Sequence, residues 1–149
     1  MKRTFEFIKY NDCDYNFVYQ AKKHGYKDYV EKFYGKWDDD EQYKMFDNYI
    51  GVRKNFIEIV VLDGEKIGFV DANETEIGEF EIGNICLLPE FCGKGFGTHY
   101  FEMLADNHAN QIWKLRVFKN NPAQRLYKRV GFEITQETDT HFYMVRKPK

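Results

Sequence analysis

The sequence is poor in the residues that cross-link or stiffen a small protein. It contains three prolines and three cysteines among 149 residues. The three cysteines, Cys13, Cys86 and Cys92, cannot all pair within one chain, and none lies in a CxxC spacing. Zinc binding and thioredoxin-like chemistry therefore find no support, and we expect no metal site. Free thiols are typical of a reducing compartment.

Long apolar runs are also missing. The first ten residues carry Lys2 and Arg3 but then Glu6 and Lys9, which does not match a signal peptide. No other segment is apolar enough to span a bilayer, so we expect a cytoplasmic protein with no membrane partner. The net charge of −2 argues against a protein that binds nucleic acid by neutralising many phosphates.

The composition is that of a folded protein. Hydrophobic residues make up 43% of the chain and aromatic residues 18%. The length fits one domain over residues 1–149, and there is no linker or internal repeat.

Hydrophobic periodicity predicts alternating helices and strands. In the N-terminal part we expect a strand over Thr4–Ile8 and a helix that Asp12 or Asp14 caps and that Gly25 ends. Apolar residues continue at helical spacing over 26–37 and 45–50, with the charged run Asp38–Glu41 between them. A hairpin follows, with strands over 56–62 and 66–72 joined by Asp63-Gly64.

The C-terminal part predicts a strand–helix–strand crossover and a closing hairpin. We expect strands over about 76–88, 113–117, 132–134 and 141–145, and helices over 98–108 and 123–130. The resulting order is typical of a mixed α/β domain with antiparallel hairpins and one crossover.

Alternating glycines follow the long predicted strand. Pro89 ends that strand, and Gly93, Gly95 and Gly97 then precede Thr98, where we expect a helix to begin. Glycine permits positive φ angles and, having no Cβ, lets a phosphate approach the backbone. The first N–H groups of a helix have no internal partners and carry partial positive charge. The segment therefore predicts an anion site of the size of a pyrophosphate.

Two other nucleotide motifs do not fit this loop. A Walker A loop needs Gly-Lys-Ser/Thr, but Gly95 follows Lys94. A dinucleotide fingerprint counted from Gly93 needs glycine where Thr98 stands, and the ribose-binding acid of a Rossmann repeat is missing. From the loop alone, a glycine-rich turn without a ligand remains the alternative.

Two blocks of sequence resemble the motifs of one family. Residues 84–97 resemble motif A of the GNAT superfamily of N-acetyltransferases, which ends in Gln/Arg-x-x-Gly-x-Gly/Ala. Residues 120–127, with the trailing pair Gly131-Phe132, look like the following motif, Asn-x-x-Ala-x-x-x-Tyr. Both blocks have the family's order and spacing over about residues 76–135. Cys92 departs from the pattern, because the family usually has Gln or Arg there.

The resemblance implies a GNAT-like α/β domain with a twisted, mixed, mostly antiparallel sheet of about seven strands and helices on both faces. It implies acetyl-coenzyme A (acetyl-CoA) as the cofactor. The backbone of Leu87 and Leu88 would bind the pantetheine arm and the thioester, Asn120 would contact the cofactor near pantetheine, and Tyr127 would lie by the sulfur. The pyrophosphate would be bound by the amides of Gly93, Lys94, Gly95, Phe96, Gly97 and Thr98.

Acetylation by direct attack needs a neutral amine, a polarised thioester carbonyl and a proton for the leaving thiolate. The N–H of Leu87 is a candidate oxyanion donor. Tyr127 is the candidate acid, as in many relatives, although packing alone also explains a tyrosine in this helical stripe. Glu81 stands near the glutamate base of the histone-acetylating relatives. Glu79, a water chain or a simple solvated strand face are the alternatives for that position.

The acceptor is expected to be a primary amine, a small molecule in preference to a protein or peptide. A non-catalytic acyl-CoA sensor is the alternative that Cys92 keeps open. Aromatic residues and acids of the first helices could line the acceptor site, but core packing and a solvated helix turn explain most of them better. These residues are Tyr26, Tyr29, Tyr34, Trp37 and Asp38–Glu41. Exposed edge strands make a homodimer conceivable, and none of the four histidines has ligand spacing.

Overall fold

The computed structural model describes residues 4–148, which form two compact units. Unit 1 contains the chain up to Asp71 together with Asn84–Cys92, and unit 2 contains Ala72–Gly83 together with the chain from Gly93 onward. Two strands, β3 and β4, contribute residues to both units. That residues 1–149 form one domain stays a prediction.

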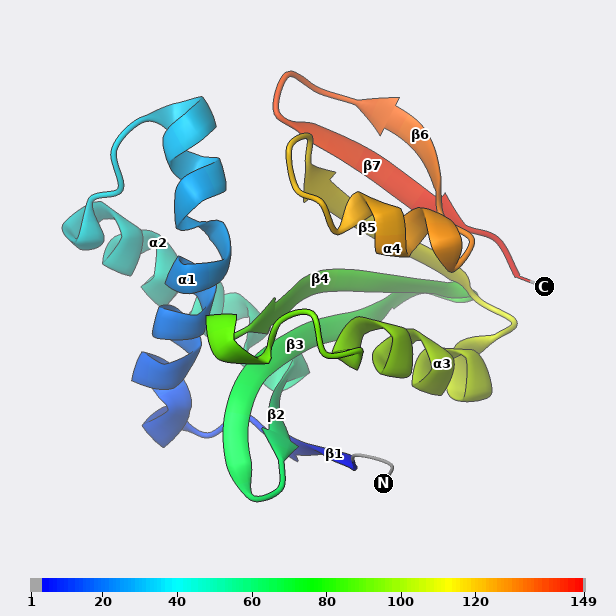
Figure 1. Cartoon of the computed structure of the whole chain (residues 1–149), viewed down its shortest axis with the longest axis horizontal. Helices are drawn as coiled ribbons and strands as arrows, with labels where there is room; N and C mark the ends of the chain where they lie inside the picture. Colours follow the sequence, from blue (N-terminus) through cyan, green and yellow to red (C-terminus); the bar gives the residue numbers. More distant parts are fainter. Residues whose placement is uncertain (1–3, 149) are drawn as a thin grey trace. The chain divides into compact units, whose positions relative to one another are not determined.

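Seven strands and four α-helices make up the described chain. Seven strands were expected, and the mixed α/β class is confirmed. In chain order the elements are β1 (Phe5–Lys9), α1 (Tyr15–Tyr34), α2 (Asp39–Arg53), β2 (Ile57–Leu62), β3 (Glu65–Glu76), β4 (Glu79–Leu87), α3 (Phe96–His108), β5 (Ile112–Phe118), α4 (Gln124–Arg129), β6 (Glu133–Glu137) and β7 (His141–Arg146), labelled in Figure 1.

The strands form one sheet in the order β1-β2-β3-β4-β5-β7-β6. β4 and β5 pair in parallel, and α3 connects them along the chain, which confirms the predicted crossover. The pairs β1–β2, β2–β3, β5–β7 and β6–β7 are antiparallel. The mixed, mostly antiparallel sheet is therefore confirmed.

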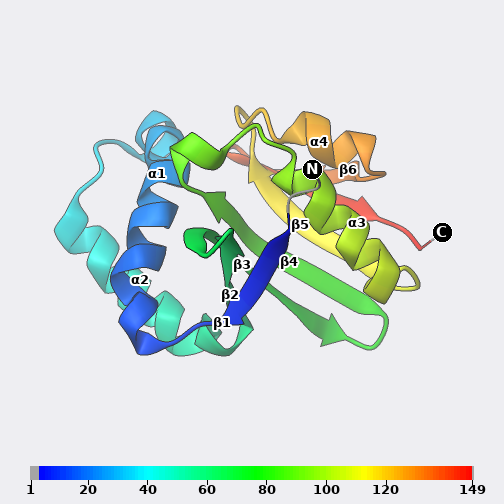
Figure 2. The same ribbon diagram turned by 60° about the horizontal axis from the view of Figure 1, so that its bottom comes forward.

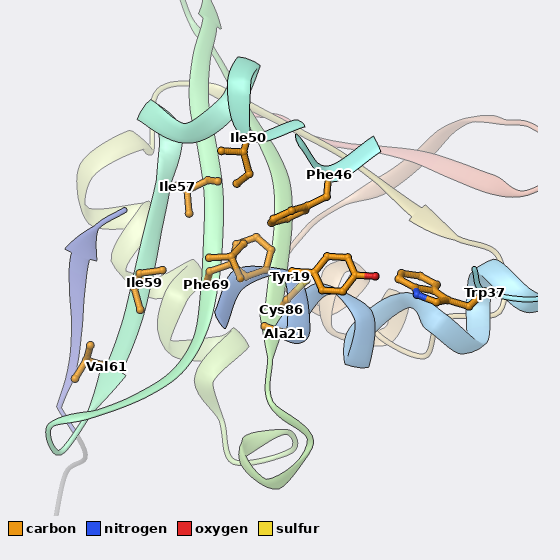
Figure 3. Packing of buried hydrophobic residues seen from close by; sticks show 11 residues of the cluster. Tyr19, Ala21, Trp37, Phe46, Ile50, Ile57, Ile59, Val61, Phe69 and Cys86 are labelled. Carbon is orange, nitrogen blue, oxygen red and sulfur yellow. The ribbon is translucent and has the colours of Figure 1, made fainter. Parts of the chain in front are cut away.

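The core of unit 1 joins α1 and α2 to the first strands. Figure 3 shows Phe46 of α2 directed toward Phe69 of β3, whereas the hydroxyl of Tyr19 of α1 points toward Trp37. Tyr19 also stacks on Tyr43 with ring centroids 4.0 Å apart. The apolar stripes that predicted the two helices are thus the faces that bury this core.

Gly68 brings two backbones of unit 1 unusually close. A Cβ placed on Gly68 would lie 2.1 Å from the carbonyl oxygen of Cys86 and 2.8 Å from Cα of Leu87. Only glycine allows β3 to lie against the end of β4 at this distance. The register of β2 and β3 also shifts at Val60/Val61, opposite this position.

The core of unit 2 is built on Trp113 of β5. The ring of Phe101 from α3 lies 6.2 Å from that of Trp113, and Phe132 lies 6.3 Å from it. Arg146 of β7 covers the same indole with its guanidinium carbon 3.8 Å from the ring centroid. Figure 2 shows α3 running alongside β5, as these contacts require.

Several predicted boundaries are wrong. α1 does not end at Gly25 but continues to Tyr34, because Gly25 lies against Cys86 and the next turns pack on the core of unit 1. Gly35, with a φ of 101°, ends the helix instead. Asp14 does stand at the N-cap position of α1, as predicted, but it makes no capping hydrogen bond there and is ion-paired with Lys66 at 2.6 Å. Asn11 caps the short 3-10 turn before the helix, where its side chain accepts from Cys13 N–H.

The strands near the site also differ from the prediction. β3 reaches Glu76 and β4 begins at Glu79, so the segment expected to open one long strand forms the turn between two. α3 begins at Phe96 rather than at Thr98. The last hairpin is longer than expected, with β6 extending to Glu137.

Replacing Gly68 with alanine tests the close approach of β3 and β4. We expect Gly68→Ala to lower the free energy of unfolding by at least about 1–3 kcal/mol, because the new methyl group meets backbone that cannot rotate away. Urea unfolding monitored by circular dichroism measures the change. Gly51→Ala is the control, since no atom lies within 4 Å of its added Cβ and α2 should gain slightly. Equal stability of the two variants would contradict the proposed constraint.

Candidate functional site

The glycine loop of unit 2 leads into the start of α3. Gly93 and Gly95 have φ angles of 75° and 87°, and a Cβ on either would meet nothing within 4 Å. Gly95 occupies the N-cap position of α3 in the left-handed conformation, where no side chain accepts the first N–H groups. No side chain therefore competes with an anion for these N–H groups. Because Gly93 and Gly95 have no Cβ, no side chain stands between the N–H groups and the anion.

The other residues of the loop have distinct positions. Phe96 is buried and stacks on Tyr100 with ring centroids 5.9 Å apart, so its side chain fixes the first turn of α3. Gly97 lies against α4, since a Cβ there would meet Leu126 Cδ2 at 2.4 Å. Lys94 is exposed and Thr98 is half-buried. The glycines of the loop thus serve two purposes, conformation at 93 and 95 and packing at 97.

The end of β4 in unit 1 distinguishes Leu87 from Leu88. The N–H of Leu88 donates to the carbonyl of Ile67 at 2.8 Å, and its carbonyl accepts from Phe91 N–H at 2.9 Å. The N–H of Leu88 is therefore engaged by β3. That the backbone of Leu87 and Leu88 binds the cofactor stays a prediction. Successive N–H groups of a strand point to opposite edges, so the N–H of Leu87 points away from β3.

Cys92 closes the turn after β4. Its Sγ lies 3.6 Å from the carbonyl oxygen of Leu88 and 3.8 Å from that of Leu87. Burial, and then the charge of Glu90, raises the pKa of this thiol, so it stays protonated and can donate weakly to both carbonyls. The cysteine that departs from the family motif thus contacts the end of β4.

A buried polar cluster supports β4, and the sequence analysis missed it. Asp71 of β3 is fully buried and accepts from Arg53 at 2.7 Å, from Asn84 of β4 at 2.5 Å and from the Tyr49 hydroxyl. Burial, and then the charge of Asp71, raises the pKa of Tyr49. Residues from three elements that are far apart in sequence, α2, β3 and β4, therefore fix the strand that ends at Leu87. Polar residues at apolar strand positions are the only local signal of such a cluster.

Asn120 and Tyr127 lie in unit 2. Asn120 is exposed in the turn after β5, which Gln124 stabilises by donating to the carbonyls of Phe118 and Lys119 at 3.3 and 2.7 Å. Tyr127 of α4 is half-buried, with its ring edge-to-face with Phe101 at 5.8 Å and Phe132 at 5.9 Å. Packing on two aromatic rings orients Tyr127 but does not assign its hydroxyl a role.

The two glutamates of β4 are not equivalent. Glu79 is ion-paired with Lys114 at 2.8 Å, which raises the pKa of Lys114. Glu81 is exposed and lies opposite Lys114 in the β4–β5 register, at the last pair of that ladder. The two carboxylates thus differ: that of Glu79 is ion-paired with Lys114, whereas that of Glu81 lies at the last residue pair between β4 and β5.

The predicted site residues divide between the two units. The glycine loop, Glu81, Asn120 and Tyr127 belong to unit 2, whereas Leu87 and Leu88 belong to unit 1. Asp38 caps α2, and Asp39 accepts from Tyr19, Lys23 and Trp37, bonds that lower its pKa to about 2. Trp37 is 8% exposed, so packing and capping account for these residues.

Residues 4–148 are the part of the chain that the structure describes. Within that range no group of three or more His, Cys, Asp or Glu side chains could hold a metal ion. No helix in the same range is long and apolar enough to cross a membrane.

Comparison with known proteins agrees with the sequence motifs. The model of the acetyltransferase (GNAT) family matches residues 23–132. No curated protein matches the sequence significantly.

Solved structures with the same fold are numerous. The PaiA N-acetyltransferase of Thermoplasma acidophilum, solved with coenzyme A, is 16% identical with a TM-score of 0.70, and 97% of this chain and 99% of that chain are covered. PH1933 of Pyrococcus horikoshii OT3 is 18% identical with a TM-score of 0.74 and 99% of both chains covered. The ribosomal-protein-S18-alanine N-acetyltransferase of Escherichia coli is 18% identical with a TM-score of 0.67, covering 96% and 93%.

Changing Gly95 tests whether its left-handed conformation presents the amides of α3. We expect Gly95→Ala to weaken coenzyme A binding about ten-fold, since a side chain costs roughly 1–2 kcal/mol at this φ and the loop relaxes. Isothermal titration calorimetry measures the dissociation constant. Gly35→Ala is the matched control, because Gly35 also has a positive φ and open space but ends α1 in unit 1. Equal binding by the two variants would argue against the loop.

Proposed function

This chain belongs to the acetyltransferase (GNAT) family, and from that premise we propose that it transfers the acetyl group of acetyl-CoA to a primary amine by direct attack. Members of the family use acetyl-CoA, and the PaiA structure contains coenzyme A. The enzyme class and the cofactor follow from the family, whereas the residues and the acceptor are our proposal.

One observation carries the proposal: α3 begins at a left-handed glycine with no capping side chain. The diphosphate of coenzyme A carries the negative charge that uncovered helix N–H groups bind. Gly93 and Gly95 add no Cβ that would hold a phosphate away. The residues present therefore fit the pyrophosphate by the chemistry of their donors.

The proposed reaction forms a C–N bond and breaks the C–S bond of the thioester. The amine nitrogen attacks the acetyl carbon, and the N–H of Leu87 stabilises the negative charge that develops on the carbonyl oxygen. Tyr127 donates its phenolic proton to the departing thiolate. Asn120, exposed in the turn after β5, contacts the pantetheine part.

The amine must lose a proton to attack. Of the two glutamates of β4, we assign this role to Glu81, because the carboxylate of Glu79 is held by Lys114. Glu81 is exposed, so it reaches the amine directly or through one water. A longer water chain is the alternative base.

We propose a small-molecule amine as the acceptor. Two of the acids at the start of α2, Asp38 and Asp39, already accept hydrogen bonds within unit 1, which weakens the case that they attract a cationic peptide. A peptide acceptor, as in the Escherichia coli neighbour, is the second candidate, and a sensor that binds without turnover is the third.

Release of coenzyme A separates these candidates. The full chain is assayed with acetyl-CoA against small amines and against peptides with a free N-terminus, and thiol production is measured. Turnover with small amines supports our proposal, and turnover with peptides alone favours the second candidate. Calorimetric binding of acetyl-CoA without thiol production in any sample identifies a sensor, and absence of binding overturns the assignment.

Removing the Tyr127 hydroxyl tests its role as acid. We expect Tyr127→Phe to lower kcat about ten-fold or more, while the dissociation constant of acetyl-CoA stays unchanged, because the ring keeps its contacts with Phe101 and Phe132. Steady-state kinetics and calorimetry provide the two numbers. Unchanged turnover would reduce Tyr127 to a packing residue.

The two glutamates allow a matched comparison. We expect Glu81→Gln to lower kcat/KM about 100-fold at neutral pH, as loss of a general base does. Glu79→Gln removes a partly exposed ion pair, which contributes little to stability, and should retain near-native turnover. If both variants keep full activity, the proton leaves through water.

A further inference from the structure

Arg116 is the basic residue of β5 that lacks an acidic partner. Lys114, two residues earlier, is ion-paired with Glu79 at 2.8 Å, and Lys119, just after the strand, with Glu137 at 2.7 Å. Arg116 is exposed and has no carboxylate or hydrogen-bond acceptor among residues 4–148. Because Lys114 and Lys119 are each paired with a carboxylate, Arg116 is the basic side chain of β5 whose charge is not neutralised by an ion pair.

The neighbours of Arg116 are compatible with an anion. Tyr143 of β7 lies directly opposite it in the register and is 36% exposed. His141, opposite Phe118, stacks on that ring at 4.1 Å and bonds Thr140 at 2.7 Å. Burial, and then the charge of Arg116, lowers the pKa of His141, so its imidazole is neutral at pH 7. On the β7 side, Arg116 thus has neutral neighbours that offer hydrogen bonds, whereas the carboxylate of Glu81 on β4 lies opposite Lys114.

The pairing of β4 with β5 ends before it reaches Arg116. The β4–β5 ladder ends at Glu81↔Lys114, two residues before Arg116. Continued in register, the residue opposite Arg116 would be Gly83, which has no side chain and is exposed. Figure 1 shows β7, and not a helix, as the other neighbour of β5 within the strand layer. No residue of β4 is therefore paired with Arg116, and its guanidinium is exposed and accessible to a ligand.

We propose that Arg116, with Tyr143, binds a carboxylate on the acceptor, so that the substrate is an amino acid-like amine with its amino and carboxylate groups separated by a short carbon chain. This inference rests on the proposed acetyl transfer. Arg116 precedes Asn120 by four residues, a distance of at most about 14 Å along an extended chain. The side chain of Arg116 and an amine acceptor with a five-carbon chain, placed end to end, together span the distance from Arg116 to Asn120. Arginine is suited to this role because its planar fork matches a carboxylate bidentately.

A pair of amines that differ only at one end tests the inference. The probes are 5-aminopentanoate and pentylamine, with kinetics measured by coenzyme A release. We expect the native protein to show a KM for 5-aminopentanoate about ten-fold below that for pentylamine. Arg116→Ala should remove this difference by raising only the KM for 5-aminopentanoate, with kcat and the KM for acetyl-CoA unchanged. Arg116→Lys should restore it in part.

Arg129→Ala is the control, because Arg129 is an exposed arginine of α4 and its removal changes the net charge equally. It should alter neither amine. The inference is overturned if the native protein does not prefer the carboxylate, if Arg116→Ala raises both amine KM values equally, or if it weakens acetyl-CoA binding.

A binding measurement separates this inference from the proposed reaction. In the presence of coenzyme A, 5-aminopentanoate should raise the melting temperature of the native protein but not of Arg116→Ala. A rise in melting temperature without thiol release would support the carboxylate site and contradict the transfer reaction. Thiol release without this rise and without the KM difference would support the transfer reaction and contradict the carboxylate site.

Discussion

The backbone conformation at Gly93 and Gly95 is the constraint on which the candidate site depends. Helix N–H groups bind an anion only when no capping side chain takes them and no Cβ stands before them. Two left-handed glycines in open space satisfy both conditions at the start of α3. Phe96 then anchors the first turn by burial, so that the donors are held by packing that lies behind them.

Other glycines of the chain also leave space by having no side chain, but there other parts of the protein fill that space. At Gly68 the space is filled by the backbone of β4, and at Gly97 by Leu126 of α4. At Gly93 and Gly95 nothing in the described chain fills it. Glycines that are alike in sequence therefore differ in purpose, and only the surrounding atoms distinguish a packing glycine from one that leaves room for a ligand.

Features determined by local sequence were predictable. The crossover, the glycine loop and the amphipathic stripes of α1 and α2 follow from periodicity and from the chemistry of glycine. The continuation of α1 through Gly25 was not predictable, because it depends on Cys86, sixty-one positions away, and on the core of unit 1. The Asp71 cluster was missed for the same reason, since its partners come from α2 and β4.

Within the site, the sequence could not distinguish residues of the same type. Leu87 and Leu88 are equivalent in the motif, but the bond from Leu88 to Ile67 fixes which N–H points away from β3. Glu79 and Glu81 share a strand face, but the ion pair to Lys114 involves only Glu79. In both cases a partner on a neighbouring strand decides, and strand register is set by tertiary packing rather than by the residues of one strand.

The distribution of charge partners bears directly on acceptor selection. A net charge of −2 suggests attraction of cationic amines, but many acidic groups are already engaged: Asp14 with Lys66, Asp39 with Lys23, Asp71 with Arg53, and Glu79 with Lys114. Each of these pairs engages one acid and one base, so the net charge is unchanged but particular carboxylates are taken. What distinguishes one amine from another is the local position of the charged groups without an ion-pair partner, and on β5 that group is positive. An amine acceptor that also carries an anion is consistent with both facts, since its amino group needs to be neutral when it attacks and its carboxylate supplies the charge by which it is bound.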